Sequence, residues 1–176
     1  MTSDAAKRAT DKLVFQVHIN GRIDDVWREI TRTDAPQGCF FNAVLHTTGL
    51  RPGGKVQMRT KSGGNTLVIG EVLEFDPPRR YAVTFRFTQY DDPPCKVIHD
   101  LREVPGGVEY TLTVEDVAAG SKTAKDMTGG GKMIVNSLKR IVETGRPSLA
   151  TRLMYKMFGL MEFVLPKKCR SKNWPL

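Results

Sequence analysis

Between Thr66 and Glu115, apolar and polar residues alternate in runs of eight to ten residues, and clusters of Pro, Gly and Asp separate the runs. In the run 79–88, for example, Tyr81, Val83, Phe85 and Phe87 share one parity, and Asp91-Asp92-Pro93-Pro94 follows. A period of two indicates strands with one buried face. Turns this short leave room only for antiparallel neighbours. The pattern therefore predicts an antiparallel meander.

The same pattern extends the meander in both directions along the chain. It predicts strands over 13–19, 40–47, 55–60, 66–75, 79–88, 96–103 and 108–115. Between the first two, Ile23, Val26, Trp27 and Ile30 recur at helical spacing, with Asp24 and Asp25 in the first turn, where they suit the helix dipole. One short helix is therefore predicted between the first and second strands.

The period changes to a helical one after Gly120. Met127, Ile134, Leu138 and Ile141 share a helical face. The triplet Gly129-Gly130-Gly131 is a poor helix interior, because each Gly costs about 1 kcal/mol relative to Ala. We therefore expect a flexible or bent start and a firm helix over 132–144, ended by Gly145 and Pro147.

A curved sheet must cover its apolar face, and this late helix is the only large candidate. The expected fold is α+β: a curved antiparallel sheet wrapped around a long helix, with space between them. Three segments follow: a polar N-terminal stretch 1–12, a domain 13–145 and an extension 146–176, here called the tail. No run of about 18 apolar residues predicts a membrane span, and residues 1–12 lack an apolar signal core. With three scattered cysteines and no disulfide framework, we expect a cytoplasmic protein.

The positive charge is concentrated in the tail. Seven of the 27 basic residues and one of the 19 acidic residues lie there, so the tail carries +6 of the net charge of +8 and residues 1–145 carry +2. A body this close to neutral argues against nucleic-acid binding across the main fold.

The tail itself has the pattern of an amphipathic helix. Ser148 is a candidate N-cap and Pro166 a stop, and one apolar stripe runs through Leu149, Leu153, Met157, Leu160, Met161 and Val164. The wide apolar face suggests substantial burial. Three interpretations stay open: packing on the body, a homodimer through this helix, or contact of residues 148–172 with a membrane or partner protein.

No catalytic, metal or cofactor site is predicted from residue spacing. Gly49 to Lys55 matches G-x-x-x-x-G-K, but Val56 and a strand follow where a phosphate-binding loop needs Ser or Thr and a helix. His99 shares the inward parity of Val97 and Leu101, where a polar group could orient a ligand or act as a base. Since no acidic residue is placed beside it by spacing, a core histidine with a satisfied hydrogen bond is the simpler interpretation.

Several segments together resemble a known family. They are Phe15–Asn20 running into Asp25-Val26-Trp27, then Arg51–Lys55, Gly70–Tyr81 and Pro105–Thr113. In this order they resemble the SRPBCC (START/Bet v 1-like) superfamily and its branch similar to the activator of Hsp90 ATPase. The resemblance covers about residues 13–144 and implies the helix-grip fold. The triple glycine and the tail depart from the family pattern.

In that fold, inward-facing residues line a cavity, and Met is a pliable liner for apolar ligands. The resemblance therefore implies binding of a small hydrophobic molecule, lipid or polyketide-like. Because residue spacing predicts no catalytic, metal or cofactor set, we expect this binding to occur without catalysis and without a cofactor or metal. The residues expected to line the cavity are Trp27, Phe40, Phe41, Met58, Phe85, Phe87, His99, Tyr110, Met127 and Ile134. Two alternatives are a polyketide cyclase or aromatase with His99 or Tyr110 as acid or base, and an Hsp90-type co-chaperone.

Overall fold

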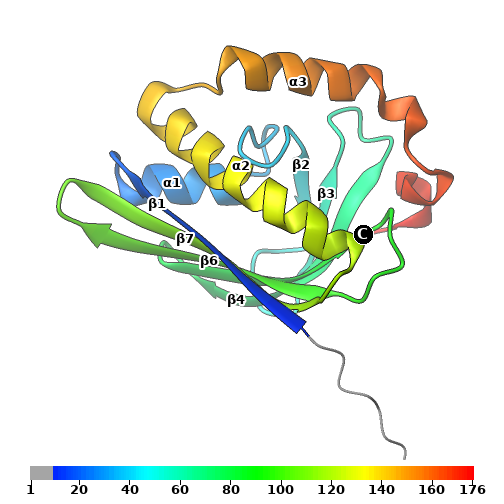
Figure 1. Cartoon of the computed structure of the whole chain (residues 1–176), viewed down its shortest axis with the longest axis horizontal. Coiled ribbons are helices and arrows are strands. Elements are labelled where there is room, and N and C mark those ends of the chain that lie inside the picture. The colour runs from blue at the N-terminus through cyan, green and yellow to red at the C-terminus, as the bar shows by residue number, and fades with distance from the viewer. Residues whose placement is uncertain (1–9) are drawn as a thin grey trace, which may run out of the picture.

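The computed structural model describes residues 10–176 and folds them into one seven-stranded antiparallel sheet with three helices (Figure 1). The strands are β1 (Thr10–Ile19), β2 (Val44–Thr47), β3 (Lys55–Arg59), β4 (Thr66–Asp76), β5 (Arg80–Phe87), β6 (Cys95–Val104) and β7 (Gly107–Ala118). The helices are α1 (Ile23–Thr31), α2 (Lys122–Thr144) and α3 (Leu149–Leu160), followed by three single 3-10 turns at Glu162–Val164, Lys167–Cys169 and Ser171–Asn173. The predicted α+β helix-grip fold is confirmed.

Strand order in the sheet is β1-β7-β6-β5-β4-β3-β2, so the strands from β2 to β7 form the predicted meander and β1 closes it at the far edge. The register aligns the inward residues of neighbouring strands: Tyr81 lies opposite His99, and His99 opposite Leu112. Figure 1 shows α2 lying across the curved sheet. The sheet thus presents one continuous apolar face to this helix.

The second strand is shorter than predicted. Residues 40–43 form a turn instead, because Phe41 and Asn42 have φ angles of 53° and 60°, and the bridge from Gln37 to Ala43 closes a loop there. Asn adopts the left-handed region readily, whereas Phe seldom does. The turn directs the two neighbouring aromatic residues, Phe40 and Phe41, toward the space under α2.

The prediction that the long helix becomes firm only at Lys132 is wrong, since α2 begins at Lys122 and continues through the glycines. Its first turn is capped twice: Ser121 Oγ accepts from the backbone N–H of Ala124, and Asp92 accepts from the backbone N–H and the hydroxyl of Thr123. A Cβ on Gly131 would lie 2.2 Å from the ring of Phe15 on β1. This glycine therefore allows α2 to approach the sheet closely.

The tail helix ends at Leu160, well before the stop predicted at Pro166, and its predicted apolar stripe is not buried. Ser148 caps α3 as expected, by accepting from the backbone N–H of Thr151. The buried residue of α3 is Tyr155, whose hydroxyl donates to the carbonyl of Gly38 over 2.7 Å. Leu149, Leu153 and Leu160 are 79%, 70% and 78% exposed. The helix packs with its Tyr155 side inward and turns these three leucines outward.

The remainder of the tail packs along β3 and β4. Gln57 donates to the carbonyl of Trp174, Asn65 forms a bridge with Arg170, and Cys169 is fully buried. Glu162 accepts hydrogen bonds from Thr60, Ser62 and Asn65. These contacts make the tail part of the body's surface. No helix formed by residues 10–176 is both long and apolar enough to cross a membrane.

Candidate functional site

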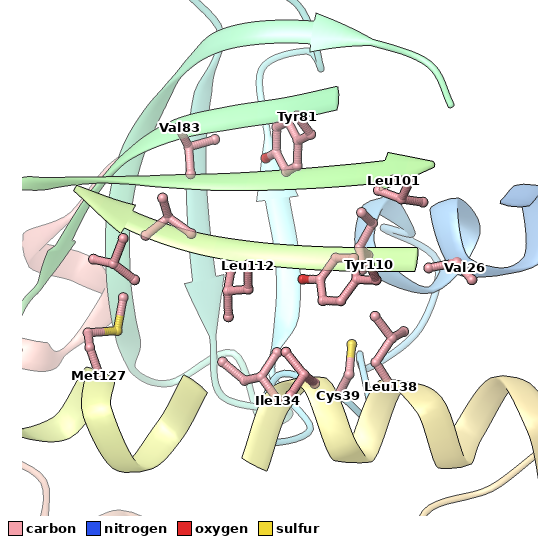
Figure 2. Packing of buried hydrophobic residues seen from close by; sticks show 14 of the residues in the cluster. Val26, Cys39, Tyr81, Val83, Leu101, Tyr110, Leu112, Met127, Ile134 and Leu138 are labelled. Atoms are coloured by element: carbon pink, nitrogen blue, oxygen red, sulfur yellow. The ribbon is translucent and has the colours of Figure 1, made fainter. Parts of the chain in front are cut away.

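A cavity of about 860 Å³ lies between the sheet, α2 and the tail. This volume falls within the usual range for sites that hold a small organic molecule. Figure 2 shows how its inner wall is built: Met127 and Ile134 of α2 point toward the sheet, Ile134 lies against Leu112 on β7, and Tyr81 and Val83 extend from β5. The apolar side chains that alternate along the strands and those that share one face of α2 thus line the same cavity.

Eight of the ten residues expected to line a cavity do line this one. They are Phe40, Phe41, Met58, Phe85, Phe87, His99, Met127 and Ile134. Phe85 and Phe87 contact each other edge to face, with ring centroids 4.8 Å apart. The side chains around the space are therefore predominantly aromatic and apolar.

Trp27 and Tyr110 do not lie on the cavity wall, which corrects two of the expected site residues. Trp27 packs against Phe75 with ring centroids 5.3 Å apart, on the part of α1 that faces β4. Tyr110 is fully buried, and its hydroxyl lies behind His99. Strand parity correctly places Tyr110 in the core, and helical spacing places Trp27, which is partly buried, against it. Neither pattern distinguishes a core position from a cavity position.

A buried polar contact at the cavity joins His99 and Tyr110. The hydroxyl of Tyr110 lies 2.7 Å from His99 Nδ1. The imidazole stacks against Tyr81 at 5.5 Å and meets Phe40 edge to face at 5.7 Å. Burial lowers the pKa of His99 to about 4 and raises the pKa of Tyr110 well above its usual value. Both side chains are therefore neutral at pH 7.

The tail contributes the part of the cavity wall that sequence reasoning missed. Tyr155, Phe158, Met161, Val164, Leu165 and Cys169 all line the cavity. A second periodic set was visible in the sequence, since Tyr155, Phe158, Glu162 and Leu165 follow at steps of three, four and three. The longer and more aliphatic stripe on the other side of the helix obscured it.

Within residues 10–176 no cluster of three or more His, Cys, Asp or Glu side chains could hold a metal ion. The cysteines at 39, 95 and 169 are all buried and unpaired. Burial, with a smaller contribution from Glu29, raises the pKa of the Cys39 thiol far above its usual value. What the site offers chemically is an apolar space with one neutral imidazole in its wall.

Comparison with protein families matches residues 20–143 to the family described as "Activator of Hsp90 ATPase homolog 1-like protein". The match spans well over half of the chain. The chain belongs to this family. A search of the curated proteins found no match.

Several solved structures share the family fold. Protein MLL2253 from Mesorhizobium loti is similar with a TM-score of 0.63 and 16% identity, over 76% of this chain and 97% of that one. The Aha1 dimer from Colwellia psychrerythraea is similar with a TM-score of 0.63 and 14% identity, over 77% of this chain and 98% of that one. At these identities the similarity establishes the fold alone.

CalU16 from Micromonospora echinospora is similar over a longer stretch. Its TM-score is 0.60 at 21% identity, over 92% of this chain and 98% of that one. Residues 1–145 make up less than 92% of the 176-residue chain, so part of the tail has a counterpart in CalU16. A tail behind the family domain is therefore not peculiar to this protein.

Proposed function

We propose that this family member binds a small, predominantly apolar molecule in the cavity between the sheet, α2 and the tail. The observation that carries the proposal is the cavity itself, about 860 Å³ in volume and lined by aromatic, aliphatic and methionine side chains. Protein interiors are normally close-packed, with few voids larger than a water molecule. An apolar space of this size is stabilised when an apolar molecule fills it.

The neutral state of the buried side chains supports an uncharged ligand. His99 and Tyr110 are both neutral at pH 7. Of the charged residues that reach the cavity, Lys61 and Asp126 are exposed, and the half-buried carboxylate of Glu162 is already held by hydrogen bonds from the β3–β4 hairpin. A charged group of the ligand placed against the inner wall would be buried without a charged partner, and this would raise the free energy of the complex. The body of the ligand is therefore hydrophobic and uncharged.

A titration with the neutral dye N-phenyl-1-naphthylamine tests the proposal. Its fluorescence should rise on binding to the wild-type chain. Replacing Ile134 with Trp places a large ring in the cavity and should weaken dye binding by at least tenfold, while Leu73→Trp, on the exposed face of β4, should leave it unchanged. A wild-type chain that is folded and does not bind the dye would contradict the proposal.

The cyclase or aromatase alternative is favoured by one observation, the His99–Tyr110 pair at the cavity. A histidine with a pKa of about 4 is a weak base at pH 7. Among residues 10–176, no carboxylate forms a hydrogen bond with either member of the pair, so nothing would stabilise an imidazolium. Binding without catalysis accounts better for this pair.

The co-chaperone alternative rests on the family description and on the Aha1 structure from Colwellia. Measuring the ATPase rate of an Hsp90-type chaperone with and without this chain tests it. A rate that does not change would exclude it.

A further inference from the structure

The wall of the cavity carries a hydrogen-bond donor that no protein group within residues 10–176 uses. His99 is 5% exposed, and its Nδ1 is engaged by Tyr110. In the described part of the chain, two side-chain polar atoms are fully enclosed without a partner, Gln37 Oε1 and Arg86 Nε. His99 Nε2 has no partner either, yet it is not among the enclosed atoms. Its small exposed surface therefore faces the cavity.

The pairing with Tyr110 decides which of the two ring nitrogens of His99 carries the proton. Tyr110 is fully buried, and among residues 10–176 its hydroxyl has no other hydrogen-bond partner than Nδ1. If Nδ1 carried the proton, the hydroxyl hydrogen of Tyr110 would be buried without an acceptor, at a cost of about 1–3 kcal/mol. The favourable arrangement has Tyr110 donating to Nδ1, so that the neutral ring carries its proton on Nε2. The cavity therefore contains an N–H donor with a fixed direction.

Other buried polar side chains of the wall are already occupied by protein acceptors. Gln37 donates to the carbonyl of Arg32, Gln57 to that of Trp174, and Thr88 to that of Thr66. His99 is thus the buried position from which a ligand would receive a hydrogen bond.

We infer that the cavity selects neutral apolar molecules that carry one hydrogen-bond-accepting oxygen, a carbonyl or a hydroxyl, which binds to the Nε2–H of His99. This inference rests on the proposed function and names the ligand class of the same cavity. His99 is then a specificity-determining residue. Tyr110 is a positioning residue, because it acts through the tautomer of His99.

A matched pair of probes tests this ligand class. We would measure displacement of N-phenyl-1-naphthylamine by 2-acetylnaphthalene, which has a ketone, and by 2-ethylnaphthalene, which does not. The wild-type chain should bind the ketone about tenfold more tightly. In His99→Phe, which keeps an aromatic ring between Tyr81 and Phe40, the two probes should bind equally. Met58→Leu, also on the cavity wall, should keep the preference.

The outcomes separate this inference from the proposed function. If the dye binds and the wild-type chain shows no preference for the ketone, or if His99→Phe retains the preference, the inference is overturned and the proposed function stands. If the dye itself does not bind, the proposed function fails. The wild-type comparison needs no variant, so it holds even if His99→Phe folds poorly.

A separate observation concerns the outward side of the tail. Leu149, Leu153, Met157 and Leu160, here called the outer ridge, follow one side of α3, and Phe163 lies just beyond it with 85% of its surface exposed. Large apolar side chains in one exposed row mark an interaction surface. Arg152 and Lys156 lie along the same side of the helix, and neither forms a salt bridge with residues 10–176.

The charge around the outer ridge indicates what it contacts. The tail has one acidic residue, Glu162, and its carboxylate is already held by Thr60, Ser62 and Asn65. A second copy of the chain docked on the ridge would bring two sets of uncompensated cations together. An anionic lipid surface compensates them and also takes up the apolar side chains. We propose that α3 docks on an anionic membrane through its outer ridge.

Co-sedimentation with vesicles tests this docking surface. The chain should pellet with phosphatidylcholine vesicles that contain roughly 30% phosphatidylserine, and much less with phosphatidylcholine alone or in high salt. Replacing Leu153 and Leu160 with Glu should lower binding at least tenfold, while Leu73→Glu on β4 should not change it. Binding that does not depend on phosphatidylserine would overturn the proposal. So would a dimer in solution that the ridge substitutions convert to a monomer.

Discussion

The imidazole of His99 is neutral because it is buried in the cavity wall between Tyr81, Tyr110 and Phe40. Its pKa falls from 6.5 to about 4 in the folded chain. The unfolded chain therefore binds a proton at a higher pH than the folded chain does. Protonation favours unfolding, so the stability that depends on neutral His99 is complete above pH 6.5 and falls as the pH decreases toward 4.

Acid should therefore destabilise the wild-type chain more than the His99→Phe variant. From the two pKa values, the free energy of unfolding should fall by about 2 kcal/mol more in the wild type between pH 8 and pH 5. Urea unfolding of both chains at the two pH values measures this difference. Met58→Leu, which leaves His99 in place on the same cavity wall, is the control and should keep the wild-type pH dependence. Equal losses in the wild type and in His99→Phe would contradict the assigned pKa.

Strand parity alone places His99 inward, and the structure agrees. Parity could not reveal its hydrogen bond to Tyr110, because that contact depends on the register of β6 and β7. Leu112 is the direct cross-strand partner of His99, and Tyr110 is its diagonal neighbour. Register between strands is fixed by turns and core packing over the whole sheet, which a local pattern does not contain.

At the scale of elements, the three glycines of α2 differ in their roles. Gly131 has the ring of Phe15 at 2.2 Å from where a Cβ would lie, whereas a Cβ on Gly129 meets nothing within 4 Å. Helix propensity treats the two positions alike, and for that reason the predicted helix began too late. Close packing on β1 and the caps at Ser121 and Asp92 offset the intrinsic cost of the glycines.

Alanine substitutions at these two glycines should have opposite effects. Gly129→Ala should raise the free energy of unfolding by about 0.5–1 kcal/mol, because alanine favours the helix and the site is open. Gly131→Ala should lower it by about 1–3 kcal/mol, because Phe15 must move. Thermal or urea unfolding of the pair compares them. A stabilising Gly131→Ala would show that the helix does not approach the sheet as described.

Glu162 connects the segment that follows α3 to the hairpin between β3 and β4 by accepting hydrogen bonds from it. Burial raises its pKa, but hydrogen bonds from Ser62, Thr60 and Asn65 outweigh this and hold the pKa below its usual value. Glu162→Ala should therefore speed hydrogen exchange of the backbone amides in 161–170 while leaving α2 protected. Glu103→Ala, an exposed carboxylate on β6, is the control. Unchanged exchange in 161–170 would show that this anchor does not hold the tail.

At the scale of the whole molecule, the tail is both the basic segment and part of the cavity wall. It carries +6 of the net charge of +8, and it places Tyr155, Phe158 and Leu165 at the cavity. The distribution of Lys and Arg along the sequence could assign the positive charge to the tail, and the family pattern could predict the sheet and α2. Neither could show that the tail folds back, because that depends on single contacts such as Tyr155 with Gly38 and Gln57 with Trp174.

Deleting residues 146–176 should leave a folded domain that binds apolar molecules poorly. The family match ends at residue 143, so the sheet and α2 should persist. The cavity would lose the wall made by Tyr155, Phe158, Met161 and Leu165. Circular dichroism should keep the signal of the sheet, and affinity for N-phenyl-1-naphthylamine should fall at least tenfold. Unchanged dye affinity would show that the tail does not enclose the site.

Native mass spectrometry of the freshly purified chain would show whether the cavity holds a neutral apolar molecule. We expect a population heavier than the 19.7 kDa polypeptide by the mass of one small molecule. Solvent extraction should release that molecule as an uncharged, oxygen-bearing apolar compound, and Ile134→Trp should abolish the heavier population. A folded chain that is found only at the polypeptide mass, and that takes up no apolar molecule when one is added, would show that the cavity is not a binding site for such molecules.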